Sequence, residues 1–217
     1  MDEKTLIARR VALELADGDL VNLGIGLPTL VARYIPAGRH VFFQSENGIV
    51  GMSGPIAGAE NPDLTDAGGN PISALPGAAS FDSAMSFGLI RGGHLDITVL
   101  GGLQVDEEGR LANWMVPGKM VPGMGGAMDL VTGAKRVIVA MQHSAKGESK
   151  IVKRCTLPLT SVRRVNIVVT DMAVIEPTDK GLVLREVAPG VSVQDVLKAT
   201  EAELIVPANV LEMALAA

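Results

Sequence analysis

The sequence has few aromatic residues and a single cysteine. Phenylalanine, tryptophan and tyrosine make up 3% of the 217 residues, and Cys155 is the one cysteine. A lone cysteine excludes an intrachain disulfide and is typical of proteins in a reducing compartment. The start of the chain is acidic at Asp2 and Glu3 and leads into an amphipathic stretch, which does not fit a secretory signal peptide. We therefore expect a cytoplasmic protein.

Long apolar runs and clusters of basic residues are also missing. Runs such as residues 137–141 are far too short to span a bilayer. The chain has 19 Lys and Arg against 24 Asp and Glu, a net charge of −5, and its basic residues cluster no further than short runs such as Arg9-Arg10. Such a pattern cannot form a stripe that follows nucleic-acid phosphates. We expect neither a membrane nor a nucleic acid as a partner.

What the sequence does have is aliphatic residues and glycine. Hydrophobic residues make up 47% of the chain and glycine occurs 25 times. The mean hydropathy of +0.32 is high for so few aromatics, which suggests that another subunit covers part of the apolar surface. There is no repeat, low-complexity tract or linker-like segment, so residues 1–217 are expected to form a single domain around one core.

Short β-branched runs between Gly, Pro and Asn residues predict strands. The runs cover residues 20–23, 41–44, 97–100, 137–141, 165–170 and 182–187. Most are apolar on both faces, as expected of a central, largely parallel sheet with helices on both faces. Helical patterns cover residues 4–16, 28–35 and 192–204, and another begins at Ala127. The predicted fold class is α/β.

A glycine turn at Gly24 and Gly26 is the first candidate site. It lies between a predicted strand and a predicted helix that opens with Pro28, where backbone N–H groups can approach an anion. Thr29 occupies the place of the third glycine of a dinucleotide fingerprint, so an NAD site is not expected. A tight turn without a ligand remains an equal alternative.

The second candidate is Gln44-Ser45-Glu46-Asn47-Gly48, at the end of the predicted strand 41–44 and directly after it. Ligands of open α/β sheets lie beyond the carboxyl ends of the strands, which is where this sequence places a carboxylate. Taken alone, however, these residues fit an ordinary surface turn with a solvated glutamate better than they fit a catalytic site.

The third candidate is the Gly- and Met-rich segment 117–130. Clustered glycine N–H groups can form an oxyanion pocket or cover an acyl chain, and methionine side chains exclude water. The alternative is a flexible loop buried against a partner.

Other common catalytic patterns are missing from the sequence. His40, His94 and His143 have no acidic residue or cysteine at metal-ligand spacing, so no metal site is predicted. There is no G-x-S-x-G motif, and Cys155 is interpreted as a small core residue. A carboxylate is therefore the candidate nucleophile.

Taken together, six segments resemble a known family. They are Val21-Asn22-Leu23-Gly24-Ile25-Gly26-Leu27-Pro28, Ser45-Glu46-Asn47-Gly48, Arg91-Gly92-Gly93-His94, Gly102-Leu103-Gln104-Val105-Asp106, Ala112-Asn113-Trp114 and Gly123-Met124-Gly125-Gly126-Ala127-Met128-Asp129-Leu130. In order and spacing, from about residue 6 to residue 203, the chain resembles the B (beta) subunit of class I coenzyme A transferases of the 3-oxoacid type. The resemblance implies the CoA-transferase fold, to which some sugar-phosphate isomerases are related.

The resemblance also implies a mechanism and a set of site residues. In this family the Glu of S-E-N-G is the covalent nucleophile, so Glu46 would form a glutamyl anhydride and then a glutamyl-CoA thioester. Backbone N–H groups around Gly125 and Gly126 would hold the oxyanion. Five further residues would shape the pocket, namely Asn22, Gly24, Gly26, Asn47 and Gly48. Coenzyme A would be bound as a thioester substrate, with no permanently bound cofactor.

Members of the family share their chemistry between two homologous chains, so the resemblance implies an A subunit and a two-plus-two heterotetramer. The segments around residues 104–107 and 116–120 look closer to acetoacetate-using enzymes, in ketone-body or short-chain fatty acid metabolism, than to the 3-oxoadipate branch. The acids exchanged would be short carboxylic or 3-oxo acids, and the donor stays open between succinate, acetate and butyrate.

Two alternatives are kept. A sugar-phosphate isomerase of the related fold should show several acidic and lysine residues near one loop, which the sequence lacks. A noncatalytic regulatory subunit would keep the fold but lose the nucleophile, whereas Glu46 lies in an intact S-E-N-G.

Overall fold

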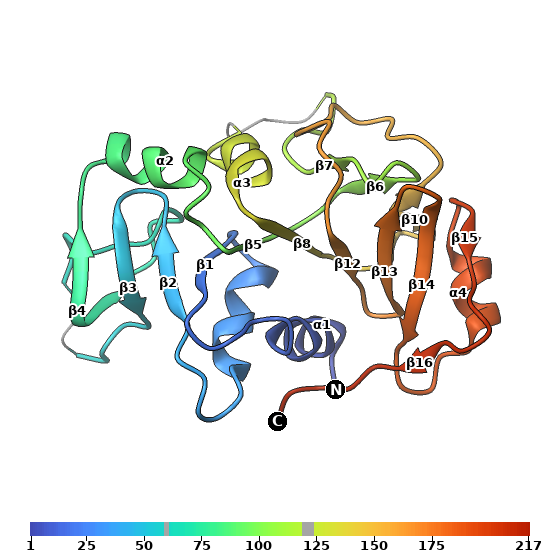
Figure 1. Cartoon of the computed structure of the whole chain (residues 1–217), viewed down its shortest axis with the longest axis horizontal. Helices are drawn as coiled ribbons and strands as arrows, with labels where there is room; N and C mark the ends of the chain where they lie inside the picture. Colours follow the sequence, from blue (N-terminus) through green and yellow to red (C-terminus); the bar gives the residue numbers. More distant parts are fainter. Residues whose placement is uncertain (59–60, 119–123) are drawn as a thin grey trace.

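The computed structural model describes residues 1–58, 61–118 and 124–217 and contains one large sheet with helices on both of its faces (Figure 1). The sheet's centre consists of five strands that pair in parallel in the order β12-β8-β5-β1-β2. These strands are β1 (Leu20–Leu23), β2 (Phe42–Ser45), β5 (Ile97–Leu100), β8 (Arg136–Ala140) and β12 (Ile167–Val169). The predicted fold class and the parallel centre are confirmed.

Antiparallel strands extend this centre on both sides. Beyond β2 lie β3 (Ile49–Ser53) and β4 (Ser73–Ser80), and beyond β12 lie β13 (Ala173–Thr178) and β14 (Gly181–Val187). The strand predicted over residues 182–187 therefore exists, but it belongs to an antiparallel hairpin with β13. Its residues alternate between buried and less buried positions because one face of the hairpin is less covered.

Short strands complete the structure. Two of them, β15 (Leu204–Ile205) and β16 (Leu211–Glu212), pair in parallel with β14. Small separate sheets are formed by β6 (Gln104–Asp106), β7 (Leu111–Ala112) and β11 (Ile151–Val152), and by β9 (Ser144–Ala145) and β10 (Glu148–Ser149).

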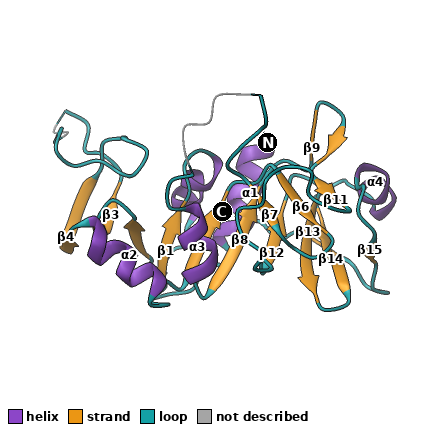
Figure 2. Cartoon of the chain, turned by 90° about the horizontal axis from the view of Figure 1, so that it is seen from above, coloured by secondary structure: helices purple, strands orange, loops and turns teal. Residues whose placement is uncertain are grey.

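Helices cover the two faces of the parallel centre. On one face lie α1 (Glu3–Ala12) and the 3-10 helix η1 (Leu27–Tyr34), and on the other lie α2 (Ser83–Arg91) and α3 (Ala127–Gly133) (Figures 1 and 2). The short helix α4 (Val193–Ala199) lies beside β14 and β15. In the three described ranges, every helix is too short or too polar to cross a membrane.

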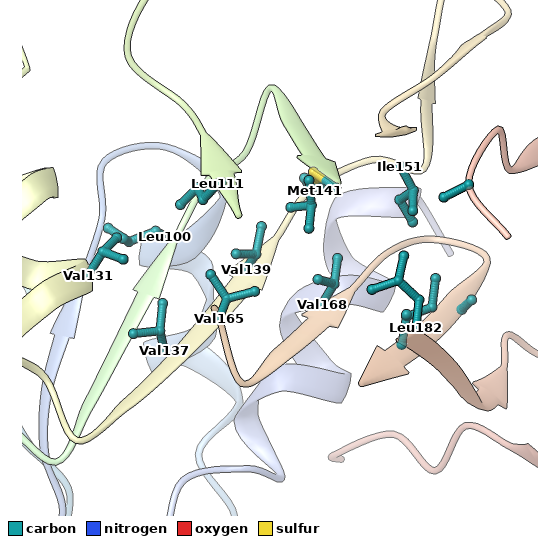
Figure 3. Packing of buried hydrophobic residues seen from close by; sticks show 14 of the residues in the cluster. Leu100, Leu111, Val131, Val137, Val139, Met141, Ile151, Val165, Val168 and Leu182 are labelled. Carbon is teal, nitrogen blue, oxygen red and sulfur yellow. The ribbon is translucent and has the colours of Figure 1, made fainter. Parts of the chain in front are cut away.

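Each central strand contributes to two cores. On β8, Val137 and Val139 pack into the core beneath α2 and α3 (Figure 3), whereas Ile138 and Ala140 pack into the core beneath α1. All four residues of β5 are buried as well. Because neither face of these strands meets water, β8 and β5 are mostly apolar and do not alternate between apolar and polar residues.

The predicted helices exist, with three differences. The first ends at Ala12, four residues early, because Leu13, Glu14 and Leu15 hydrogen-bond three residues back in a tighter turn. The second is a 3-10 helix, in which Pro28 lacks an N–H. The last has the predicted Ser192–Asp195 capping box but ends at Ala199, and Leu204 pairs with β14 instead.

Arg10 on α1 is a buried charged residue. Its side chain is 7% exposed and makes two 2.7 Å hydrogen bonds to Glu186 on β14. It also pairs with Glu14, which in turn pairs with Arg136 on β8. Burial alone would raise the pKa of Glu14, but the hydrogen bonds and charges of the two arginines hold that pKa below its usual value. This buried ion network ties α1 to two strands of the sheet.

His143, just beyond β8, is another buried polar residue. It is 0% exposed, and its ring nitrogens lie 2.9 Å from the hydroxyl oxygens of Thr170 and Thr200. Burial lowers the pKa of His143 to about 4, against an opposing effect of Asp171. The folded state therefore holds this imidazole neutral.

Protonation of His143 should weaken the fold in mild acid. Its pKa falls from 6.5 to about 4 on folding, so its contribution to stability is present above about pH 6.5 and is lost as the pH falls towards 4. For this single group the loss between about pH 7 and about pH 5 is roughly 2 kcal/mol. Urea unfolding at both pH values should show a smaller pH dependence for His143→Gln than for the wild type. The matched control is His40→Gln at an exposed position, and an equal pH dependence in all three proteins would contradict the prediction.

Candidate active site

Asn22 and Glu46 meet at the carboxyl ends of β1 and β2. The two strands pair in parallel with Asn22 opposite Gln44, so their ends lie at the same edge of the sheet. Glu46 follows β2 directly, and Asn22 Nδ2 donates a 3.0 Å hydrogen bond to Glu46 Oε2. The register thus joins two motifs that lie 24 residues apart in the chain.

Gly126, at the start of α3, lies against the same carboxylate. A Cβ atom at this glycine would lie 3.3 Å from Glu46 Cγ and 3.4 Å from Glu46 Oε1. Helix α3 is held against α2 by a 2.6 Å ion pair between Arg91 and Asp129. The helices approach closely at Gly133, where a Cβ atom would lie 2.2 Å from the carbonyl oxygen of Ile90. The G-x-G-G-A-M-D-L segment thereby reaches Glu46.

The two carboxylate oxygens of Glu46 have different surroundings. Oε2 accepts the hydrogen bond from Asn22, whereas Oε1 has no hydrogen-bond partner within the described ranges and lies on the side of Gly126. The side chain is half-buried rather than solvated. One oxygen is therefore held in place while the other keeps its lone pairs available, which is the arrangement that a carboxylate nucleophile requires.

A cleft of about 530 Å³ opens beside Glu46. It lies between β1, η1, β2, β3 and the loop of residues 66–72. Apolar side chains make up much of its wall, among them Leu23, Ile25, Phe43, Met52, Ile72 and Leu75. A largely apolar cavity with a few charged side chains at its wall, here Arg33, Glu46 and Asp66, is typical of a small-molecule site.

Gly48 closes the turn that carries Glu46. Its φ of +128° suits glycine, and a Cβ atom there would lie 2.0 Å from the carbonyl oxygen of Phe81. Phe81 also donates its N–H to the carbonyl oxygen of Gly48 over 2.9 Å. Gly48 is thus required by the close approach of the chain segment that leads into α2.

Four other residues predicted for the site do not touch the Glu46 carboxylate. Asn47 is exposed, and its amide donates to the carbonyl oxygen of Thr65. Gly24 donates its N–H to the carbonyl oxygen of Val99 over 2.8 Å. Gly26 and Gly125 have φ values of +90° and +54°, and a Cβ atom on either would meet nothing within 4 Å. Of the third candidate segment, residues 119–123 lie outside the described residues, so Gly123 is not placed.

Gln44 belongs to the second candidate segment, although the sequence assigned it no role, and two further residues near Glu46, Ser86 and Phe87, were missed by sequence reasoning. Gln44 and Ser86 are buried and hydrogen-bonded to one another, and Phe87 lies beside Gly126. A polar glutamine at the end of an apolar strand was a signal for Gln44. Ser86 and Phe87 gave no signal, because residues 83–91 were not predicted to form a helix.

The remaining candidate residues lie apart from this carboxylate. Burial is the main cause, and the charge of Asp106 the second, that raises the pKa of the half-buried Cys155 thiol to about 12. Such a thiol is a poor nucleophile. Among the residues with described positions, no group of three or more His, Cys, Asp or Glu side chains is placed to hold a metal ion. The 102–106 and 112–114 motifs have structural contacts, such as the 2.8 Å ion pair of Asp106 with Arg110 and the 2.6 Å hydrogen bond from Thr160 to Asn113.

Comparison with known proteins gives a consistent family match. The family model described as coenzyme A transferase matches residues 4–199. The chain is 61% identical to the beta subunit of the acetate CoA-transferase of Escherichia coli K12, over 96% of both chains. It is 52% identical to the B subunit of the succinyl-CoA:3-ketoacid coenzyme A transferase of Helicobacter pylori 26695, over 91% of this chain and 96% of that protein.

Among solved structures, the acyl-CoA transferase apoenzyme of Escherichia coli O157:H7 superposes with a TM-score of 0.79. The match covers 98% of this chain but 43% of that one, so this chain spans less than half of its length. At 24% sequence identity, this likeness shows the fold alone.

Proposed function

This chain belongs to the coenzyme A transferase family, and from that premise we propose that it is the B (beta) subunit of a 3-oxoacid coenzyme A transferase with Glu46 as covalent nucleophile. The observation that carries the proposal is the environment of Glu46, where Asn22 holds one carboxylate oxygen and Gly126 lies beside the other. The family match and the names of the relatives favour this function over a sugar-phosphate isomerase.

In the first step, Glu46 Oε1 attacks the carbonyl carbon of an acyl-CoA thioester. The carbon–sulfur bond breaks, coenzyme A leaves as a thiolate, and the acyl group remains on Glu46 as a mixed anhydride. No proton is transferred, since the nucleophile is a carboxylate and the leaving group is a thiolate. A base next to Glu46 is therefore not required.

In the second step, the thiolate attacks the Cδ atom of Glu46. The bond between Cδ and Oε1 breaks, the first acid leaves as a carboxylate, and coenzyme A is bound to Glu46 as a thioester. An acceptor carboxylate then reverses both steps, takes up coenzyme A and restores the Glu46 carboxylate. Charge develops on Oε2 whenever Cδ is attacked, and Asn22 Nδ2 lies 3.0 Å from that oxygen. Asn22 is thus placed to stabilise this oxyanion.

Backbone N–H groups at Gly125 and Gly126 would serve the other oxyanion, which forms on the acyl carbonyl. The position of Gly126 beside Oε1 supports this assignment, because the incoming thioester must occupy the same space. Gly24, Gly26, Asn47 and Gly48 would shape the surrounding pocket.

Short carboxylic or 3-oxo acids, with acetoacetate among them, are the acids that we propose are exchanged. The names of the relatives, which include acetate and 3-ketoacid transferases, support this substrate class. The cleft beside Glu46 has room for such an acyl group, and its wall is largely apolar.

An A subunit would complete the enzyme, as a two-plus-two heterotetramer in the cytoplasm. Relatives that this chain matches along almost their whole length are named as a beta or B subunit. Large apolar side chains are also exposed near Glu46, with Ile25 at 67% and Leu75 at 48% in the cleft and Met128 at 41% on α3. Contact with a second subunit would remove these side chains from water.

The covalent role of Glu46 can be tested directly. Incubation of the assembled enzyme with acyl-CoA and no acceptor should leave a CoA-sized adduct on the peptide that contains Glu46, sensitive to hydroxylamine. Glu46→Gln should fold normally, form no adduct and lose essentially all transfer. Glu46→Asp withdraws the carboxylate by one methylene and should be slower by about a hundredfold or more. Intact-protein and peptide mass spectrometry give both readouts.

The matched control is Glu148→Gln, which removes an exposed carboxylate on β10 and should leave the adduct and the turnover unchanged. An adduct on a different residue, or an active Glu46→Gln enzyme, would overturn the assignment of the nucleophile. A folded wild-type enzyme without any transfer activity would favour a noncatalytic subunit.

Gly126→Val should slow the reaction without unfolding the protein. The new side chain would crowd Glu46 and Phe87, while the φ of −82° at this position is open to any residue. Loss of one oxyanion interaction corresponds to about a hundredfold in kcat. Gly88→Ala, on the exposed side of α2 where a Cβ meets nothing, is the control. Turnover of Gly126→Val near that of the control would show that the glycine is needed for packing only.

The subunit requirement predicts that the isolated chain is almost inactive and self-associates through its exposed apolar side chains. Co-expression with an A-type subunit should yield a complex of both chains and restore transfer over a panel of short acids. Sedimentation velocity and a coupled assay measure the two effects. Full turnover by a monodisperse sample of this chain alone would refute the two-subunit proposal.

A further inference from the structure

A chain of buried polar side chains runs from α2 to Glu46. Ser86 is 0% exposed, and Gln44 and Asn22 are each 1% exposed. Gln44 Nε2 donates to Ser86 Oγ over 2.8 Å, and Asn22 Nδ2 donates to Gln44 Oε1 over 2.9 Å. The same Nδ2 atom donates to Glu46 Oε2 over 3.0 Å. Three side chains without contact to water therefore end on the reactive carboxylate.

The chemistry of an amide explains why Gln44 matters to Glu46. An Asn side chain has two N–H donors on one atom and an acceptor on the other. Asn22 Nδ2 lies 2.9 Å from Gln44 Oε1, 3.0 Å from Glu46 Oε2 and 3.3 Å from the backbone carbonyl oxygen of Gln44, whereas Asn22 Oδ1 is buried with no hydrogen-bond partner among the described residues. The hydrogen bonds of Nδ2, and not those of Oδ1, therefore set the orientation of this amide.

The opposite orientation would be electrostatically unfavourable. After a half-turn of the amide, Asn22 Oδ1 would face three other acceptors, which are Gln44 Oε1, the Gln44 carbonyl oxygen and Glu46 Oε2. Gln44 favours the observed orientation as long as its own oxygen points to Asn22, and in that arrangement Gln44 Nε2 finds an acceptor in Ser86 Oγ. Helix α2 fixes Ser86, since Asp82 caps its first turn with a 2.8 Å hydrogen bond to the Met85 N–H.

We propose that Gln44 and Ser86 are positioning residues, which keep the Asn22 amide nitrogen directed at Glu46 Oε2 and so prepare Glu46 for both covalent steps. The inference rests on the proposed function of Glu46, and it adds two residues that do not touch the substrate. Gln44 acts through Asn22, and Ser86 acts through Gln44. Their removal should slow the chemistry rather than weaken the binding of acyl-CoA.

Thr98 on β5 offers a matched control for loss of a buried polar group. It lies opposite Asn22 in the strand register and is 0% exposed. Its hydroxyl has no hydrogen-bond partner among the described side chains and backbone, so it is not part of the chain from Ser86 to Glu46. Thr98→Val has almost the same shape and should leave the rate of the reaction near that of the wild type.

The first test compares rates of adduct formation on Glu46 in the assembled enzyme. Gln44→Met keeps the length of the side chain but removes the acceptor, and it should slow adduct formation and kcat by roughly tenfold to a hundredfold. The KM for acyl-CoA should change by less than about threefold. Ser86→Ala removes one hydroxyl and should have a smaller effect in the same direction. Rates like that of Thr98→Val for both variants would overturn the proposal.

The second test asks whether Gln44 acts through Asn22. In an Asn22→Ala background, Gln44→Met should cause almost no further loss, because the amide that it orients is gone. Losses that multiply in the double variant would show an independent, structural effect and would overturn the proposal. If Asn22→Ala does not fold, crystal structures of Gln44→Met and Ser86→Ala test the same point. The hydrogen bond from Asn22 to Glu46 should be lost or lengthened at least in Gln44→Met.

The two levels of inference fail in different ways. A wild-type enzyme that forms no adduct on Glu46 would refute the proposed function. A wild-type enzyme that forms the adduct, together with a Gln44→Met enzyme that forms it equally fast, would refute the positioning role alone.

Discussion

The parallel pairing of β1 with β2 is the constraint on which the site depends. Its register places Asn22 opposite Gln44, so that the Asn22 amide reaches the first residue after β2. A shift of β1 by one residue would turn Asn22 to the α1 face of the sheet and break its hydrogen bond to Glu46. The register is fixed by burial, because Val21 on the same strand fills the core beneath α1. Hydrophobic packing on one face thus sets the polar geometry on the other.

The second constraint is the close contact of α2 with α3, which brings a third chain segment to the site. Gly133 lets the backbones approach, and the ion pair between Arg91 and Asp129 joins the two helices at their surface. As a result, α2 supplies Ser86, which is hydrogen-bonded to Gln44, and α3 supplies Gly126, which lies against the Glu46 side chain. The rigid layer of helix and sheet explains how a short loop after β2 can hold a reactive carboxylate in one position.

The Glu46 carboxylate is held by neutral groups rather than by a charged partner. In the described part of the chain, its hydrogen-bond partner is a neutral amide backed by another amide and a hydroxyl. The exchange that we propose, between carboxylates and a thiolate, transfers no proton, so neutral donors that stabilise an oxyanion would be more useful there than an acid or a base. The family match and the geometry therefore support the same kind of chemistry.

The sequence alone determined the α/β class, the five parallel strands and the identity of Glu46 as candidate nucleophile. Runs such as β5 do not alternate between apolar and polar residues, as expected of a strand that is buried on both faces. The proposed role of S-E-N-G came from the resemblance to a known family. The end of the first helix, the 3-10 form of η1 and the antiparallel hairpin of β14 could not be predicted, because they depend on contacts with distant segments. Only the tertiary structure shows that Gln44 and Ser86, which are 42 residues apart, are hydrogen-bonded to each other and that Gln44 also accepts a hydrogen bond from Asn22. Local sequence patterns record burial and backbone preference, whereas the partner of a buried polar side chain is set by the register of strands and the packing of helices.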